Sequence, residues 1–146
     1  MKRIIYLLLV TSIFGISIFA QNAKPKVAAL PAGIATWSGE DSDKILDNAV
    51  IKTRFKNLLG KKNYADFVES WETVNPIVKK GNFLFSSGCL IHACGHVESA
   101  IAIDLVNQTV HVGIYRDEVK PKFFNEKSRK TPKAIQSWAN RLIVNR

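Results

Sequence analysis

Four short strand patterns, joined in two pairs by very short turns, constrain this fold more than any other feature of the sequence. They are predicted at residues 77–78, 83–85, 100–105 and 110–115. Gly81 permits the positive φ of a tight turn between the first two patterns, and Asn107–Gln108 forms the turn between the last two. Hairpin-length turns cannot carry the crossover that parallel strands require, so we predict an antiparallel sheet. His111 in the last strand is expected to face solvent.

Two helical patterns precede these strands. The first begins with Asp41 or Ser42 as its N-cap and ends at Gly60, which suits the left-handed conformation that terminates helices. A second, shorter helix follows with Asn63 as its cap. Its apolar side carries Phe67 and Trp71, four positions apart. Trp71 is expected to pack in the core.

The final helix is the most clearly marked element. Thr131 is its predicted N-cap, and Pro132 takes the first helical position, where a missing amide hydrogen costs nothing. Its apolar residues recur on one face at Ile135, Trp138, Ala139, Leu142 and Ile143. Helices precede and follow the run of hairpins in the sequence. This order predicts one α+β domain over 41–146, with an antiparallel sheet flanked by helices.

The first twenty residues have the layout of a secretory signal peptide. Lys2 and Arg3 precede an apolar run, and the small residue Ala20 follows it. The run is short for a bilayer span, which needs about 20 residues. We therefore predict export, a periplasmic mature protein and no transmembrane segment after cleavage. Ala20 is the predicted cleavage site, and Ala23 is a second candidate. Residues 21–40 lack a sustained period and predict an irregular arm with Trp37 as its anchor.

Basic residues outnumber acidic ones by 21 to 12, which gives a net charge of +9. Loss of Lys2 and Arg3 with the leader leaves +7. The excess lies late in the chain, at Arg116, Lys120, Lys122, Lys127, Arg129, Lys130 and Lys133. An exported protein meets envelope glycans, lipid head groups and acidic proteins, so nucleic acid is not predicted as a partner. A solvated basic face is the simpler interpretation of this charge.

Cys89 and Cys94 are the two cysteines, and thiols tend to pair in an oxidising compartment. The ring that they would close contains His92 as its one ionisable residue and lies in a connection between strands. Four zinc ligands at Cys89, His92, Cys94 and His96 would leave too little backbone for a tetrahedral site. A matched pair also argues against a single catalytic thiol. Two interpretations stay open: a disulfide-pinned turn with an exposed histidine, and a rigid loop that inserts His92 into another molecule.

The segment 83–89, the motif Cys-x-x-His-x-Cys-Gly at 89–95 and the apolar strand 100–104 resemble the inhibitors of vertebrate (C-type) lysozyme, the Ivy family. The resemblance implies a disulfide between Cys89 and Cys94 that closes a protruding loop. It also implies that His92 plugs the lysozyme cleft and bonds the catalytic carboxylates. The loop of that family reads Cys-Lys-Pro-His-Asp-Cys. This chain departs from it at three positions, Leu90, Ile91 and Ala93.

We therefore expect an exported protein that is not an enzyme and that inhibits a C-type lysozyme or a related muramidase, with no cofactor and no metal. Its target-binding loop is predicted to comprise Gly88, Leu90, Ile91, His92, Ala93 and Gly95. A homodimer is the assembly that the resemblance implies. The alternative is a periplasmic binding module of the same fold, whose basic face contacts an anionic envelope polymer.

Overall fold

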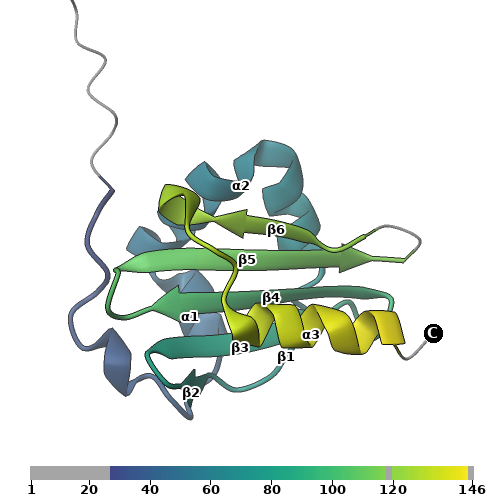
Figure 1. The fold of residues 1–146 in the computed structure, drawn as a ribbon, viewed down its shortest axis with the longest axis horizontal. Helices are drawn as coiled ribbons and strands as arrows, with labels where there is room; N and C mark the ends of the chain where they lie inside the picture. The colour runs from purple at the N-terminus through teal and green to yellow at the C-terminus, as the bar shows by residue number, and fades with distance from the viewer. Residues whose placement is uncertain (1–26, 118–119, 145–146) are drawn as a thin grey trace, which may run out of the picture.

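The computed structural model of the protein describes residues 27–117 and 120–144. Within them, six antiparallel strands form one sheet in the order β1-β3-β4-β5-β6, and β2 also pairs with β3 (Figure 1). The elements are η1 (Ile34–Thr36), α1 (Asp43–Asp47), α2 (Ala49–Glu69), β1 (Thr73–Val74), β2 (Val78–Lys80), β3 (Phe83–Cys89), β4 (Val97–Asp104), β5 (Thr109–Arg116), β6 (Lys122–Asn125), η2 (Glu126–Ser128) and α3 (Lys133–Val144). The predicted α+β class is confirmed.

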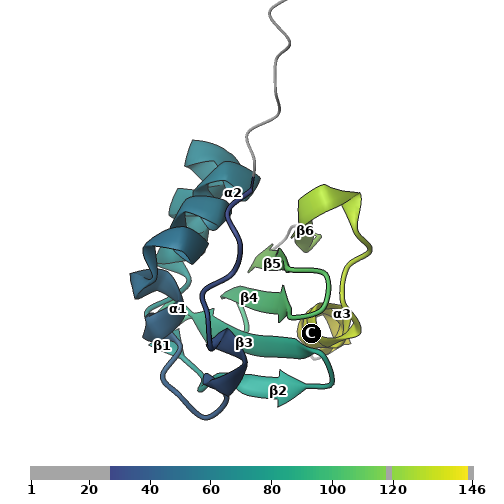
Figure 2. The ribbon, with the colours of Figure 1, turned by 90° about the vertical axis from the view of Figure 1, so that its left-hand side faces the viewer.

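Helices cover both faces of the sheet, with α2 on one side and α3 on the other (Figure 2). The central strand β4 shows the consequence, since Ile101 and Ile103 pack on the α2 side while Ala100 and Ala102 pack on the α3 side. All four of these side chains are fully buried. The sheet is therefore the middle layer of three, and two separate cores hold it in place.

The two cores differ in what they contain. The larger one joins the sheet to α1, α2 and the N-terminal arm, and it includes Leu30, Ile34, Trp37, Ile51, Phe55, Phe67, Trp71, Leu84, Ile103 and Val112. The smaller one joins the sheet to α3 through Phe85, Ala100, Ala102, Tyr115, Ile135, Trp138, Ala139 and Leu142. The core packing predicted for Trp71 and Trp138 is confirmed, although Trp71 lies just after α2 ends.

Close packing of α3 on β5 depends on Gly113. A Cβ atom at this position would lie 2.7 Å from Cζ3 of Trp138 and 2.9 Å from Cγ2 of Ile135. Any larger residue would push α3 away from the strand. The predicted final helix is present, but Ile143 in its last turn is half exposed, so its assignment to the apolar face was wrong.

The predicted helix from Ser42 to Gly60 is broken at Asn48. Asn48 has an extended backbone with ψ 115°, and its side chain accepts hydrogen bonds from the amides of Val50 and Ile51. It therefore caps a second helix rather than continuing the first. Gly60 does leave the helical conformation, with φ 67°, as predicted. The cap predicted at Asn63 is wrong, because α2 resumes directly after Gly60.

His111 is buried, which contradicts the prediction that it faces solvent. Only 2% of the residue is exposed. Its Nδ1 pairs with Oδ1 of Asn125 at 2.8 Å, and its Nε2 pairs with the hydroxyl of Thr109 at 3.0 Å. Burial lowers the pKa of His111, although the Asn125 hydrogen bond and the nearby Asp104 act in the opposite direction. The strand alternation was correct, but both faces of β5 are covered.

The N-terminal arm has more contacts than predicted. Trp37 is buried as expected, and Leu30 and Ile34 join it in the larger core. Strands β1 and β6 were not predicted, since each is short and lacks a clear alternation. The predicted signal peptide over 1–20 lies outside the described residues. In the described part of the chain, no helix is both long and apolar enough to cross a membrane.

Candidate functional site

The loop between β3 and β4 contains the predicted cysteine ring. Cys89 is the last residue of β3, and it forms a disulfide with Cys94, with the two Cα atoms 5.0 Å apart. The predicted disulfide-closed loop is confirmed. Because both sulfur atoms are in the disulfide, neither is a thiolate, and the zinc and catalytic-thiol interpretations lose their ligands and nucleophile. Among the described residues, no group of three or more His, Cys, Asp or Glu side chains is arranged to hold a metal.

Hydrogen bonds within the loop give it a compact backbone. The amide of Leu90 donates to the carbonyl of Val97 at 3.0 Å, and the amide of Ala93 donates to that of Leu90 at 3.0 Å. Amides of His96 and Val97 both donate to the carbonyl of Ala93. These bonds close successive turns, so the loop has defined geometry on both sides of its tip.

His92 lies at the tip of this loop and is exposed. Its φ of 62° is left-handed, a conformation that few residues other than glycine adopt and that a surrounding structure must hold. Within the described chain, its ring has no hydrogen-bond partner. An imidazole offers one donor and one acceptor when neutral, so this side chain is available to bond another molecule from either nitrogen.

The other predicted loop residues are distributed unevenly around His92. Ile91 beside it is 51% exposed, Leu90 and Ala93 are half-buried, and Gly95 is exposed with φ 88°. The structure brings these residues together with His92. Gly88 differs, because it lies within β3 and is buried. A Cβ there would meet Val74 Cγ1 at 3.0 Å, so Gly88 serves close packing below the loop.

Two carboxylates from outside the ring accept backbone amides of the loop, and no sequence pattern pointed to either of them. Oε2 of Glu72, which lies between α2 and β1, accepts the amide of Ile91 at 3.1 Å. Oε1 of Glu98 in β4 accepts the amide of Gly95 at 2.8 Å. Glu98 is only 9% exposed, and its Oε2 accepts the indole N–H of Trp138 at 3.0 Å. The loop is therefore joined through Glu98 to α3.

His96 at the base of the loop has a different environment from His92. Its Nδ1 pairs with a carboxylate oxygen of Asp117, and its carbonyl accepts the Asp117 amide at 2.8 Å. Both side chains are exposed. His96 therefore connects the loop to the end of β5, while the His92 ring has no such partner among the residues that the structure describes.

A cavity of about 260 Å³ adjoins the disulfide. It is lined by residues of β1, β3, β4 and α3, including Glu98 and Arg141, together with Asn75 and Cys94. The guanidinium of Arg141 in this lining lies 3.8 Å from Glu98 Oε2. A larger hollow of about 870 Å³ lies elsewhere, between the arm, α2 and η2, where the buried Arg54–Glu126 ion pair lines it. That pair joins separate segments and is a structural tie.

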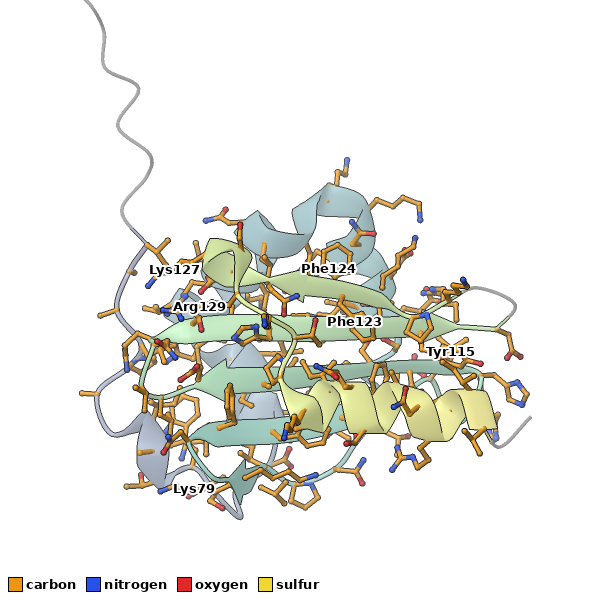
Figure 3. The ribbon with its side chains drawn as sticks, in the orientation of Figure 1. Lys79, Tyr115, Phe123, Phe124, Lys127 and Arg129 are labelled. Atoms are coloured by element: carbon orange, nitrogen blue, oxygen red, sulfur yellow. A yellow bond between two sulfur atoms is a disulfide. The ribbon has the colours of Figure 1, made fainter. Side chains whose placement is uncertain are left out.

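The cations late in the chain form a second exposed region, which we call the basic strap: Lys127, Arg129, Lys130 and Lys133. In the described part of the chain, none of these four forms a salt bridge. Lys127 donates to the carbonyl of Asn107 at 3.4 Å, in the turn between β4 and β5. This turn is at the opposite end of β4 from the loop. Figure 3 likewise shows Lys127 and Arg129 far from Tyr115, which pairs with Glu98 at the loop end.

Comparisons with known proteins bear on the loop and on the fold that supports it. The protein-family model described as "Inhibitor of vertebrate lysozyme (Ivy)" matches residues 50–143. The match runs from α2 through the whole sheet, the loop and most of α3. The predicted family is thereby confirmed. No curated protein and no solved structure matches the chain.

Proposed function

This chain belongs to the family of inhibitors of vertebrate lysozyme, and from that premise we propose that it is an exported protein that blocks a C-type lysozyme or a related muramidase with its His92 loop. The observation that carries the proposal is an exposed histidine, with no partner among the described residues, at the tip of a disulfide-closed loop. The protein acts by binding and carries out no chemistry of its own.

The chemistry of the target suits an imidazole. Retaining glycosidases hold two carboxyl groups about 5 to 5.5 Å apart, and one of them has a raised pKa. An imidazole ring can donate to one carboxylate and accept from a protonated carboxyl group at the other. A rigid loop also loses little conformational entropy on binding, which favours affinity. His92 at a constrained tip is thus suited to occupy such a cleft.

Apolar side chains surround His92 in place of the Lys, Pro and Asp of the family loop. Ile91 is half exposed beside the histidine, and Leu90 and Ala93 contribute smaller surfaces. We propose that these residues contact an apolar wall of the target cleft, where buried area rather than ion pairing supplies affinity. Gly95 completes this contact surface, while Gly88 supports it from below.

The distribution of charge over the molecule reduces the repulsion expected between this protein and a basic lysozyme. A net charge of +7 on the cleaved protein would repel a basic lysozyme if the charge were spread evenly. The basic strap instead lies at the opposite end of the sheet from the loop. At the loop end, Arg116 and Arg141 are paired with Glu69 and Glu98, and Glu72 and Asp117 lie beside the loop. Since the Debye length is about 8 Å at physiological ionic strength, distant cations have little effect on the encounter.

Export and processing are part of the same proposal. We propose that residues 1–20 are a signal peptide and that 21–40 form an arm ahead of the single domain 41–146, in a periplasmic protein. The Cys89–Cys94 disulfide supports an oxidising compartment. A mass spectrum of protein isolated from the periplasm would give the mature N-terminus. The homodimer that the family resemblance implies stays a prediction, which sedimentation velocity can test.

An assay of cell-wall lysis tests the inhibitory function. A purified C-type lysozyme clears a suspension of cell walls, and the wild-type protein is expected to slow this clearing. His92→Ala should weaken inhibition by at least about thirtyfold, because a central hot-spot residue contributes about 2 kcal/mol or more. His96→Ala is the matched control and should change inhibition little, because His96 is bonded to Asp117.

The outcomes are distinct. Equal inhibition by wild type and His92→Ala, with unchanged circular dichroism, would show that another surface blocks the enzyme. Absence of inhibition by the wild type against C-type lysozymes and related muramidases would refute the proposed function.

The unpaired cations of the basic strap favour a second candidate, binding to an anionic envelope polymer. Exposed lysine and arginine side chains without ion pairs attract polyanions, and the attraction weakens with added salt. A salt series separates the candidates: binding to an anionic glycan should weaken steeply as salt increases, whereas insertion of the apolar loop into a lysozyme should not.

A further inference from the structure

We propose that Glu98 is a positioning residue that holds the His92 loop in its binding conformation, with Glu72 in a lesser supporting role. The inference rests on the proposed function, since it concerns how the same loop is presented. It adds a component outside the disulfide ring: a buried carboxylate that connects the loop to helix α3.

The geometry of Glu98 carries the proposal. Its backbone is paired with Cys89, so it lies opposite the first residue of the ring. Its two carboxylate oxygens accept from two different donors, the Gly95 amide at 2.8 Å and the Trp138 indole at 3.0 Å. Gly95 directly follows Cys94, and its φ of 88° is open mainly to glycine. Glu98 therefore fixes the loop just where the chain leaves the ring.

Burial makes these contacts stronger than surface hydrogen bonds. Glu98 is 9% exposed and Trp138 is 3% exposed. Hydrogen bonds to an ionised acceptor are about twice as strong as neutral ones, and poor solvation increases the penalty for losing them. Among the described residues, the ion-pair partner of Glu98 is Arg141, and this contact is long at 3.8 Å. Two N–H donors thus supply most of the compensation for this buried charge.

Trp138 transmits the position of α3 to the loop. The indole packs in the smaller core, and its ring lies so close to Gly113 that no Cβ fits there. Its N–H is thereby held at a fixed place relative to β4 and β5. Glu98 bonds both this N–H and the Gly95 amide. The packing of α3 on the sheet therefore determines where Glu98 holds the loop.

Glu72 supplies a weaker contact on the other side of His92. It accepts the Ile91 amide at 3.1 Å, but the side chain is exposed. Water competes for an exposed hydrogen bond, so its contribution is expected to be small. Together the two carboxylates hold the residues that precede and follow the tip.

A double-mutant cycle distinguishes positioning from a general contribution to folding. In Glu98→Gln the side chain keeps one acceptor and presents an amide N–H₂ to the second donor, so one contact is lost. Binding to a purified C-type lysozyme should weaken about tenfold, which equals about 1.4 kcal/mol. Trp138→Phe removes the indole donor and leaves the Gly95 bond, so its affinity should fall less than about threefold.

The double variant Glu98→Gln/Trp138→Phe is the decisive protein. The glutamine oxygen is then free to accept from Gly95 without a conflicting donor, and affinity should return to that of Trp138→Phe alone. Losses that simply add in the double variant would overturn the proposal. If Glu98→Gln does not fold, Glu72→Ala still tests the support of the tip and should weaken binding about twofold. Glu69→Gln, which removes an exposed carboxylate that does not touch the loop, is its control.

A readout without lysozyme separates this inference from the proposed function. The amide hydrogen of Gly95 should exchange with solvent about tenfold faster in Glu98→Gln than in the wild type, as measured by nuclear magnetic resonance. Equal exchange rates would overturn the positioning role whatever the lysozyme data. If the wild type binds no lysozyme but exchange accelerates as expected, the proposed function fails and the positioning role stands.

Discussion

The His92 loop and the basic strap lie at opposite ends of the same sheet, and they differ in how the protein holds them. The loop is closed by a disulfide, crossed by its own hydrogen bonds and bound from outside by Glu98 and Glu72. The strap has exposed cations without ion pairs in the described chain. A region that must insert one side chain into a partner needs fixed geometry, because each ordered group costs entropy on binding. A solvated charged region does not need fixed geometry.

Removal of the disulfide should have the largest effect on this contrast. In Cys89→Ser/Cys94→Ser, the chain-entropy relation for so short a loop gives a loss of about 2 kcal/mol in stability. Affinity for lysozyme should fall at least about tenfold, because the loop then loses entropy on binding. Urea unfolding and calorimetric titration measure the two effects. Unchanged affinity would mean that hydrogen bonds alone hold the loop.

Gly113→Ala tests whether the loop depends on α3 from a distance. The new Cβ would clash with Trp138 and Ile135, and overpacking of this kind costs about 1 to 2 kcal/mol in stability. Displacement of Trp138 should also weaken inhibition about threefold, although Gly113 does not contact the loop. Gly39→Ala is a control with open space around the new methyl group, and its φ of 90° makes it unfavourable for alanine. It should lower stability without affecting inhibition.

His111 should make the strap end of the molecule sensitive to pH while the loop is unaffected. Asn125 links this buried histidine to Thr131, which lies between the strap residues. Because burial lowers the pKa of His111 in the folded protein, the unfolded chain binds its proton more readily. The stabilisation is thus complete above the unfolded pKa of about 6.5 and declines as pH falls below that value.

A comparison of wild type with His111→Gln isolates the contribution of His111 protonation to the free energy of unfolding. The difference in their unfolding free energies should change between pH 7 and pH 5, with the wild type losing more stability on acidification. Parallel curves for the two proteins would show that His111 does not titrate between the folded and unfolded states in this range.

Charge reversal in the strap should have the smallest effect on lysozyme. Lys127→Glu/Arg129→Glu is expected to change affinity by less than about twofold, because these cations are remote from the loop and screened by salt. The same variant should clearly weaken binding to an anionic glycan. A large change in lysozyme affinity would show that the strap contacts the target, and the two regions would then share one function.

Much of the fold was predictable because its signals are local. The turns at Gly81 and Asn107–Gln108 form as expected, and Gln108 adopts a positive φ of 53°. Asn48 shows where local signals compete, since the apolar pattern continues through it while its side chain caps a new helix. His111 shows a different failure: alternation identifies the two faces of a strand but does not reveal that helices or loops cover both.

The candidate site likewise combines features that local sequence predicts with contacts that depend on the tertiary structure. The sequence by itself determined the cysteine ring, the histidine inside it and the family, because these are contained in a few adjacent residues. Only the tertiary structure decided what holds the ring, since Glu72 and Trp138 lie 19 or more positions away from their partners Ile91 and Glu98. A carboxylate in a strand has no distinctive pattern of its own. Its role arises when the packing of α3 removes it from water and brings two N–H donors within reach of its oxygens.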